Sequence, residues 1–541
     1  MKKVLMVFAL ASTALTSFTF VAPKNVSEAM AVTPTYGTVV SSSKEGLLNL
    51  QTATILDIQK LLESGKLTSV ELTQMYVNRI KLMNSTGPSL NAVRSLNQNW
   101  FKEALAADQA RKAGKDTGHM QGIPVLLKDN IDVKGMPTTG GSLALVNSYP
   151  AEDAPLVKSL REAGAIILGK VNMHELAGWV TFSSPESYSS LGGMVRNPYD
   201  ASLPPGSSSS GSGVAAAVAM SSITVGTDTG GSIMNPTAIE SLAGIRPTVG
   251  LISRTGVIPI SSSQDTPGPM GRNVTDIAIA LTAMTTGVDE LDNKTLNSGP
   301  YDSTDYTQYL SVNALKGVRI GVPLVSLTGD KKILWDAALS KLEEQGASLV
   351  SIPLDMSNTG VGDMFIYTYE FKEGMQLYLN RLPAEAPIKT VNELAQYYRD
   401  HPDTMLKFGA DNLFNSEKVD LVKDHARSIK IRQKELANSK DVIDRLAKIY
   451  EVDTFVFPDG SSVAMSQKSG YPAVGVPAGY QASNRNPFGI SFLGNAAYTE
   501  GQLLGYAYAY EQATKLRQSP EETNPSLFMC IVAEKPAYCA P

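Results

Sequence analysis

Apolar residues recur at helical spacing in two stretches near the start of the globular part of the chain. Thr54 can cap a first predicted helix, and Gly65 can end it. Thr68 and Glu71 have the spacing of a capping box, which predicts the start of a second helix. The apolar positions of that second helix recur every three or four residues at Leu72, Tyr76, Ile80 and Met83.

Further along the chain, helical and strand patterns alternate. A helical pattern over residues 154–163 stops at Gly164, and the apolar run at 165–168 follows as a predicted buried strand. The same order returns at residues 332–345 and 347–350. Such alternation favours an α/β fold with a largely covered sheet. No internal repeat or long linker divides the chain, so we expect one large domain over residues 49–515, in which 360–450 form a helical cap or insertion.

The first segment has the pattern of an export signal. Lys2 and Lys3 precede an uncharged, mostly apolar stretch over residues 4–21, and Ala29-Met30-Ala31 has the small residues of a cleavage site. We therefore expect a signal peptide over residues 1–31, cleaved after Ala31, followed by a loose lead-in over 32–48. The alternative is an uncleaved membrane anchor, because 18 residues is near the lower limit of a span. Cleavage predicts a secreted or extracytoplasmic protein of bacterial type, without stable membrane insertion.

Composition narrows the classes of function. The 541 residues are 43% hydrophobic, and 47 basic residues against 52 acidic residues give a net charge of −5. Such a chain is neither disordered nor basic enough to indicate a nucleic-acid partner. Its two cysteines, Cys530 and Cys539, exclude a Cys-rich zinc site. In the tail at 516–541 of an exported chain, their spacing favours a small structural disulfide over two free thiols.

Two short motifs resemble known sites but lack essential parts. Residues 164–170 nearly match a phosphate loop, but Val171 stands where a hydroxyl would hold magnesium. His174 and Glu175 are adjacent, without the H-E-x-x-H spacing that places two metal ligands on one helix face. His174 is more simply a local hydrogen-bonding residue. No metal and no cofactor are predicted.

Two stretches rich in Gly and Ser are the densest chemical feature of the sequence. Residues 204–213 lead directly into a helical run at 214–220 and a strand at 223–225, which a flexible linker would not do. Residues 226–233 follow, with glycines that let several backbone N–H groups converge beside a Ser hydroxyl. Acyl transfer requires a nucleophile beside such donors, although a tight turn without chemistry has the same pattern.

Within residues 122–130, Lys128 stands at the end of an apolar predicted strand and is the candidate base. A lysine partly removed from water has a lowered pKa and can act as a neutral amine. In a chain with four histidines, Ser and neutral Lys form a sensible hydrolytic pair. The alternative is a lysine at a strand end that reaches solvent.

These elements together resemble the amidase signature family. The three central segments are 122–130, 205–213 and 226–232, and Ser208 and Ser232 are 24 positions apart, like the paired serines of that family. The likeness covers about residues 50–515. Further matching segments are 170–173, 196–198, 242–248, 268–270, 470–472 and 487–489. The resemblance implies one large α/β domain with a mixed central sheet that is covered by helices on both faces.

The resemblance also implies roles for individual residues. Ser232 would be the nucleophile, Ser208 a bridging serine that follows a cis peptide bond, and Lys128 the base. The N–H groups of residues 229–232 would form an oxyanion hole, of which Thr229, Gly230 and Gly231 precede the nucleophile. Three further residues are assigned supporting positions: Ser209 beside the lysine, Asp228 in the loop and Ala177 in the wall of the acyl pocket.

Three positions depart from the usual pattern of the family. Ser207 and Ser210 replace glycines of the serine-rich loop, and Met234 stands where an arginine is frequent. Loss of that arginine argues against a strongly anionic substrate. With the segments at 232–236 and 263–269, the sequence is more similar to bacterial peptide amidases than to amidotransferase subunits.

We therefore expect an exported serine amidohydrolase that cleaves carboxamides to acid and ammonia through an acyl-enzyme. The substrate would be a C-terminal peptide amide or a small aliphatic or aryl amide. One alternative is a glutamine-hydrolysing subunit of an amidotransferase, which export and Met234 disfavour. The other is an exported binding protein with the same fold and no catalysis. The sequence assigns neither the natural substrate nor the oligomeric state.

Overall fold

The computed structural model describes residues 47–115, 118–354 and 363–528. The predicted signal peptide and the two cysteines, Cys530 and Cys539, lie outside these residues. Within the described ranges, no helix is both long enough and apolar enough to cross a bilayer.

Eleven strands of the described residues form one sheet, and two short strands form a separate hairpin. The strands of the sheet are β1 Val93–Leu96, β2 Pro124–Lys128, β3 Ile166–Val171, β6 Ile223–Asp228, β7 Ala243–Arg246, β8 Thr266–Gly271, β9 Arg319–Pro323, β10 Ser348–Ile352, β11 Thr454–Pro458, β12 Ala473–Tyr480 and β13 Pro487–Gly494. The hairpin consists of β4 Tyr188–Ser189 and β5 Gly193–Met194.

The order of strands across the sheet is β1-β3-β2-β6-β8-β7-β12-β13-β11-β9-β10. Strands β3, β2 and β6 are parallel, as are β11, β9 and β10 at the other end. Antiparallel pairs join these two parallel groups through β8, β7, β12 and β13. The sheet is therefore mixed, as the sequence comparison with the family implied.

The described residues also form eighteen α-helices. They are α1 Ile55–Glu63, α2 Ser69–Met83, α3 Trp100–Lys112, α4 Pro155–Glu162, α5 Ser210–Ala217, α6 Met234–Ile239, α7 Val274–Met284, α8 Gly329–Glu344, α9 Met364–Arg381, α10 Val391–Asp400, α11 Pro402–Met405, α12 Asp411–Lys418, α13 His425–Asn438, α14 Lys440–Tyr450, α15 Val463–Ser469, α16 Glu500–Thr514, α17 Pro520–Thr523 and α18 Pro525–Phe528.

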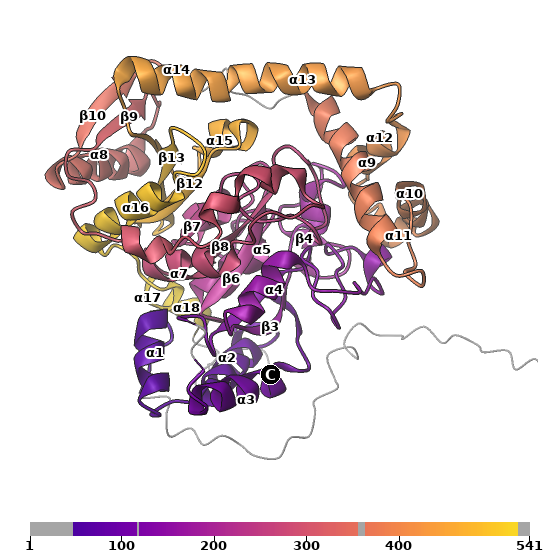
Figure 1. Ribbon diagram of the computed structural model, residues 1–541, viewed down its shortest axis with the longest axis horizontal. Helices are drawn as coiled ribbons and strands as arrows, with labels where there is room; N and C mark the ends of the chain where they lie inside the picture. The colour runs from indigo at the N-terminus through magenta and orange to yellow at the C-terminus, as the bar shows by residue number, and fades with distance from the viewer. Residues whose placement is uncertain (1–46, 116–117, 355–362, 529–541) are drawn as a thin grey trace, which may run out of the picture. The chain divides into compact units, whose positions relative to one another are not determined.

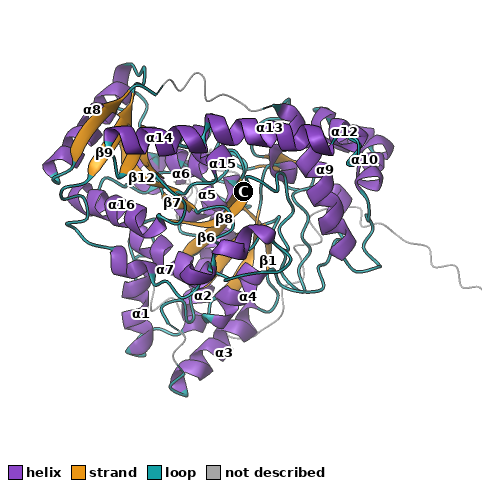
Figure 2. Ribbon diagram, turned by 45° about the horizontal axis from the view of Figure 1, so that its top comes forward, coloured by secondary structure: helices purple, strands orange, loops and turns teal. Residues whose placement is uncertain are grey.

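Both faces of the sheet are covered by helices (Figure 2). Successive side chains of a strand point to opposite faces of the sheet, so neighbouring residues of β11 contact the helices on opposite faces. Val456 packs in an apolar cluster that includes residues of α7 and α16. Its neighbours Phe455 and Phe457 pack in another cluster, which includes residues of α14 and α15. The predicted fold class, an α/β domain with a mixed sheet between helical layers, is confirmed.

The helices between Met364 and Tyr450 gather outside the sheet. In Figure 1, α9, α10 and α12 lie together at one side, and α13 and α14 run end to end away from them. Apolar residues of α9 and α10 share a third cluster with Leu176, Trp179, Ile258 and Ile260. This cluster attaches the helices to two loops beside the sheet, one around residues 176–179 and one around residues 258–260.

Local sequence signals correctly located several element boundaries. Thr54 and Thr68 each form a capping box, with Asp57 and Glu71 respectively. One boundary differs from the expectation. The helix expected at 214–220 begins four residues earlier, at Ser210, and ends at Ala217. Its first turn lies so close to Asn172 that a Cβ on Gly211 would be 2.2 Å from the carbonyl oxygen of that residue. The following strand continues to Asp228 rather than ending at Val225.

Candidate active site

Lys128 is the last residue of β2, an interior strand of the sheet. Strand β2 is flanked by β3 and β6, and the lysine side chain is fully buried. Its Nζ lies 2.8 Å from Ser208 Oγ, 2.9 Å from Ser209 Oγ, 2.9 Å from Thr227 Oγ1 and 3.2 Å from Thr227 O. The structure thus brings Lys128 together with Ser208 and Ser209, which follow it by 80 and 81 positions in the sequence.

Burial lowers the pKa of Lys128 to about 7, although the negative charges of Asp228 and Asp265 act in the opposite direction. A substantial fraction of this lysine is therefore a neutral amine at neutral pH. The hydrogen bonds around Nζ then assign a direction to the proton. Ser209 Oγ donates to Thr227 O at 3.1 Å, so it can only accept from the lysine. Ser208 and Thr227 remain as the hydroxyls that can donate to the lone pair of the amine, and Ser208 is the one in the loop that is joined to Ser232 through the backbone.

Ser208 follows a cis peptide bond, Ser207–Ser208, at the position where the resemblance implied one. Its carbonyl accepts a hydrogen bond from the N–H of His174 at 3.1 Å. The N–H of Ser209 donates to the carbonyl of Ser232 at 3.3 Å, so the two serine-containing loops are joined through their backbones. Ser232 itself is partly exposed, and its hydroxyl has no hydrogen-bond partner among the described residues.

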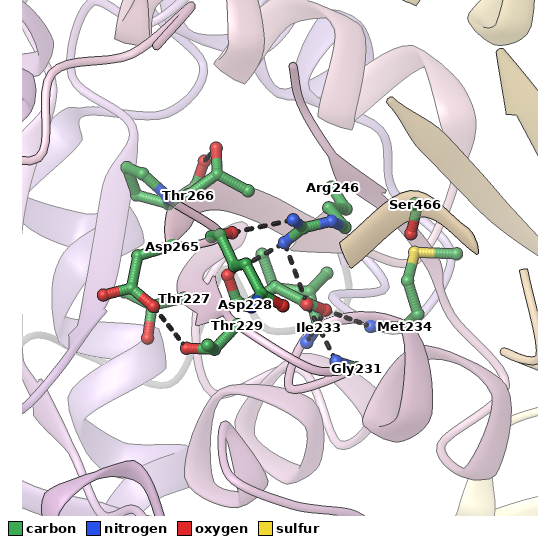
Figure 3. A network of polar contacts seen from close by, with 12 residues as sticks. Thr227, Asp228, Thr229, Gly231, Ile233, Met234, Arg246, Asp265, Thr266 and Ser466 are labelled. Carbon is green, nitrogen blue, oxygen red and sulfur yellow. Dashed lines mark hydrogen bonds and ion pairs between the residues drawn. The ribbon is translucent and has the colours of Figure 1, made fainter. Parts of the chain in front are cut away.

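Asp228 holds the loop before Ser232 in shape (Figure 3). Its carboxylate accepts hydrogen bonds from the N–H groups of Gly231 at 2.8 Å, Ile233 at 2.7 Å and Met234 at 3.2 Å. Arg246 Nη1 lies 3.0 Å from the same carboxylate, and both side chains are fully buried. These donors and the arginine compensate the buried charge, so Asp228 orders the loop rather than carrying a proton in the reaction.

The loop offers three backbone donors to a ligand. The N–H groups of Thr229, Gly230 and Ser232 have no acceptor among the described residues, while that of Gly231 already donates to Asp228. Gly230 is exposed, so the loop is open to solvent at this point. The side chain of Thr229 is held in place by Asp265, because Thr229 Oγ1 donates to Asp265 Oδ1 at 2.5 Å.

A small pocket lies beside Thr229 and Thr227. Its other lining residues are five apolar ones, Ala177, Val257, Ile258, Ile260 and Pro267, and four polar or charged ones, Asn130, Arg254, Asp265 and Thr266. Ala177, for which the resemblance implies a place in the wall of the acyl pocket, is among these lining residues. The backbone there is unusual, because Leu176 and Ala177 have φ values of 44° and 58°, a region that non-glycine residues seldom occupy.

The departures from the family pattern are accommodated in simple ways. Neither Ser207 nor Ser210 has a positive φ, so glycine is not required at either position. Met234 is fully buried and packs in the apolar cluster that contains α14 and α15 residues. Its side chain adds no charge to the pocket.

Sequence reasoning missed several supporting residues. Thr227 contacts Lys128 twice, and Arg246 and Asp265 hold the loop before Ser232. All three lie within or next to segments that carry the family resemblance, and that position was the available signal. His174 binds Ser207 Oγ through Nδ1 at 2.9 Å and Ser184 Oγ through Nε2 at 2.7 Å. Burial, aided by the charge of Lys128, lowers its pKa to about 4, so it is a neutral hydrogen-bonding residue. Among the described residues, no group of His, Cys, Asp and Glu could hold a metal ion.

Comparison with known proteins identifies the family. The sequence model of the Amidase family matches residues 71–475, more than half of the chain. A probable amidase from Arabidopsis thaliana is 34% identical over 485 residues, which cover 87% of this chain and 92% of that protein. The chain belongs to the amidase signature family. It is accordingly an amidase, a hydrolase of carbon–nitrogen bonds, and not merely a binding protein with this fold.

Solved structures of other amidases have the same fold. The native peptide amidase from Stenotrophomonas maltophilia has a TM-score of 0.81 at 37% identity, covering 87% of this amidase and 98% of that chain. An amidase family protein from Bacillus anthracis has a TM-score of 0.83 at 35% identity, covering 88% and 94%. A glutamyl-tRNA(Gln) amidotransferase subunit from Acinetobacter baumannii is 32% identical over 511 residues, covering 86% of this chain and 97% of that protein.

Proposed function

We propose that this amidase hydrolyses carboxamides to a carboxylic acid and ammonia through an acyl-enzyme on Ser232. The observation that carries the proposal is the contact between Ser208 and Lys128, a buried lysine whose pKa is lowered to about 7. A neutral amine in hydrogen-bond contact with a serine is a general base that needs no histidine.

The reaction begins when Ser232 Oγ attacks the carbonyl carbon of the amide. Its proton passes to Ser208 Oγ as the proton of Ser208 passes to Lys128 Nζ. The N–H groups of Thr229, Gly230 and Ser232 stabilise the oxyanion that forms. When the carbon–nitrogen bond breaks, the proton returns along the same path to the leaving nitrogen, and ammonia departs. Water then attacks the acyl-enzyme and gives a proton to Ser208 and Lys128 by the same path. This proton returns to Ser232 Oγ when the carboxylic acid leaves.

The substrates we propose are C-terminal amides of peptides and small aliphatic or aryl amides. Two observations support this class. The pocket beside Thr229 has an apolar part, formed by Ala177, Val257, Ile258, Ile260 and Pro267, and the chain is similar to the Stenotrophomonas peptide amidase. Esters are expected as secondary substrates, because the acyl-enzyme is the same.

Replacement of Ser232 tests the mechanism. Ser232→Ala should abolish ammonia release from a peptide amide, and it should also abolish labelling by a serine-directed fluorophosphonate. Ser210→Ala is the matched control, because Ser210 is a buried serine at the start of α5, two residues after Ser208, whose hydroxyl has no partner among the described residues. It should keep nearly full activity. Covalent labelling that survives in Ser232→Ala would disprove the assignment of the nucleophile.

Hydrolysis of free glutamine is the second candidate function. The identity with the amidotransferase subunit favours it. Met234 opposes it, because this residue adds no positive charge, and Arg254, the cation that lines the pocket, is already paired with Asp292. Glutamine carries a carboxylate that needs a cation free to bind it. Comparison of kcat/KM for glutamine with that for an N-acylated amino acid amide decides between the two. We expect the blocked amide to be the better substrate.

We also propose that the amidase acts outside the cytoplasm after removal of residues 1–31. The sequence of the first segment supports this. N-terminal sequencing of chain recovered outside the cytoplasm should begin at Val32, whereas a retained Met1 would indicate an uncleaved anchor.

A further inference from the structure

Helix α9 packs one face against the loop that precedes β8. Tyr367, Glu370, Gly374 and Tyr378 recur at helical spacing, and all four face the body of the domain. The approach is close, because a Cβ on Gly374 would lie 3.0 Å from Pro259 Cγ. At the end of this face, Tyr378 donates to Asp132 Oδ1 at 2.8 Å. The helix is therefore fixed against residues 258–265, which form one wall of the pocket beside Thr229.

Glu370 is the charged residue of this face, and only 6% of it is exposed. Its Oε2 accepts hydrogen bonds from the hydroxyl of Ser261 and from both the N–H and the hydroxyl of Ser263, the latter two at 3.3 and 2.8 Å. No cation forms an ion pair with it within the described residues. Three donors from one turn thus compensate the buried carboxylate, which fixes the turn.

The same turn carries the residue that holds Thr229. Asp265 Oδ2 accepts from the N–H groups of Ile260 at 2.8 Å and Ser261 at 2.9 Å, while its Oδ1 accepts from Thr229. Ser261 belongs to both sets of hydrogen bonds, because its hydroxyl donates to Glu370 and its N–H donates to Asp265. A continuous set of hydrogen bonds therefore runs from Glu370 to the loop that precedes Ser232.

A second set of contacts leads from α9 to the other side of that loop. Tyr367 donates to Gln264 Oε1 at 3.0 Å, and the carbonyl of Gln264 accepts from Arg246 Nη2 at 2.7 Å. Arg246 in turn binds Asp228, which holds Gly231 and Ile233 (Figure 3). Helix α9 therefore supports both ends of the segment that contains the backbone donors.

We propose that Glu370 is a positioning residue for the oxyanion hole, which it keeps in place through Ser261, Asp265 and Thr229. This inference rests on the proposed function of the loop at residues 229–232. Glu370 touches neither the nucleophile nor the base, and it acts by restricting where the N–H groups of Thr229 and Gly230 can lie. Donors that are displaced by a fraction of an ångström lose their effect mainly in the transition state, where the negative charge develops.

The effect should appear in kcat rather than in KM. Glu370→Ala removes all three hydrogen bonds, and we expect kcat for a peptide amide to fall on the order of 10- to 100-fold, with KM changed about twofold or less. Glu370→Gln keeps an acceptor oxygen without the charge, so its loss should be smaller. Fluorophosphonate labelling of Ser232 should slow in the same order, because that reaction also uses the oxyanion hole.

Glu373→Gln is the matched control. Glu373 lies on the same helix, lines the same cavity as Glu370 between α9 and α13, and binds no serine of the turn. Its replacement removes the same charge and should leave kcat unchanged. A double-mutant cycle with Asp265→Asn adds a test of the route, since the double variant should lose no more activity than the worse single variant.

Several outcomes would overturn the proposal. These are an unchanged kcat in Glu370→Ala, an equal loss in Glu373→Gln, a change in KM alone, or additive losses in the double variant. If Glu370→Ala fails to fold, Ser263→Ala is used in its place; it removes one of the three hydrogen bonds to Glu370 and should lower kcat by a smaller factor. The proposed function is tested separately by Ser232→Ala, so a normal Glu370→Ala enzyme with an inactive Ser232→Ala enzyme refutes this inference alone.

Discussion

Two buried lysines lie side by side in the sheet and have opposite surroundings. Lys128 ends β2, and Lys170 is in the neighbouring parallel strand β3. Lys170 pairs in register with Leu127, so the two lysine side chains leave the sheet on opposite faces. Lys170 Nζ lies 3.6 Å from the carboxylate of Asp129, 2.5 Å from Ile131 O and 3.3 Å from Thr138 Oγ1. Lys128 contacts hydroxyl and carbonyl oxygens and no carboxylate.

The comparison separates two uses of a buried lysine. Burial lowers the pKa of both residues, and negative charges nearby oppose this shift in both. Only Lys170 has a carboxylate in direct contact, that of Asp129, which favours its protonated form. A lysine with a carboxylate partner is a structural cation that joins segments of the fold. A lysine surrounded by neutral oxygens can release its proton near neutral pH and is fit for catalysis.

The largest expected effect comes from Lys128→Met. Removal of the base should lower kcat/KM for a peptide amide by on the order of 10²- to 10⁴-fold. The variant should unfold at a similar or higher urea concentration than the unmodified enzyme, because an apolar side chain replaces a buried amine that lacks a counter-ion. Ammonia release and urea unfolding measure the two quantities. Activity within about tenfold of the unmodified enzyme would show that Lys128 is not the base.

Lys170→Met should produce the complementary result. It leaves Asp129 buried without its cation, so we expect the free energy of unfolding to fall by about 3–5 kcal/mol. Activity per folded molecule should stay close to that of the unmodified enzyme. Addition of Asp129→Asn should restore part of the stability, since it removes the unpaired charge. A loss of activity as large as that of Lys128→Met, without loss of stability, would end the distinction between the two lysines.

The smallest expected effect is a shift of the pH profile. Lys128 accepts a proton only when neutral, so kcat/KM should rise with pH through a value near 7. Thr227→Val removes an oxygen that accepts from the ammonium form, which lowers the pKa and moves this rise to lower pH. The shift should be about one pH unit, because a hydrogen bond to a charged group contributes about 1.5 kcal/mol.

Thr138→Val is the control for this shift, because Thr138 is the corresponding hydroxyl partner of Lys170. It should leave the midpoint of the profile unchanged. Equal shifts in the two variants would mean that the profile reports something other than Lys128.

Sequence reasoning located the elements whose signals are local. Capping boxes at Thr54 and Thr68 depend on residues three positions apart, and the alternation of helix and strand near Gly164 is equally local. The order of the strands was not predicted from residue patterns, because it depends on pairing between distant segments. Strands β8 and β12 are rich in glycine and proline, which are poor strand formers, so their sequences contain no clear strand signal.

In the candidate site, too, some residues have a signal in the sequence and others are found only through contacts between distant segments. The two Gly- and Ser-rich loops are visible in the sequence, and the family resemblance named Lys128, Ser208 and Ser232. The residues that support them come from other elements. Arg246 belongs to β7, Asp265 precedes β8 and Glu370 lies in α9. Their roles follow from contacts between residues that are 18 to 107 positions apart in the sequence. A single sequence contains no spacing rule for such contacts.

The burial of Lys128 also affects how the whole protein responds to alkali. In the unfolded chain this lysine keeps its proton up to a pH near 10.5, whereas in the folded enzyme it releases the proton at about 7. Unfolding between these two values therefore takes up one proton at this residue. Since the unfolded state binds more protons, the contribution of Lys128 to folding becomes more favourable as pH rises across that window. Mild alkali thus favours the folded chain and generates the neutral amine in the same step.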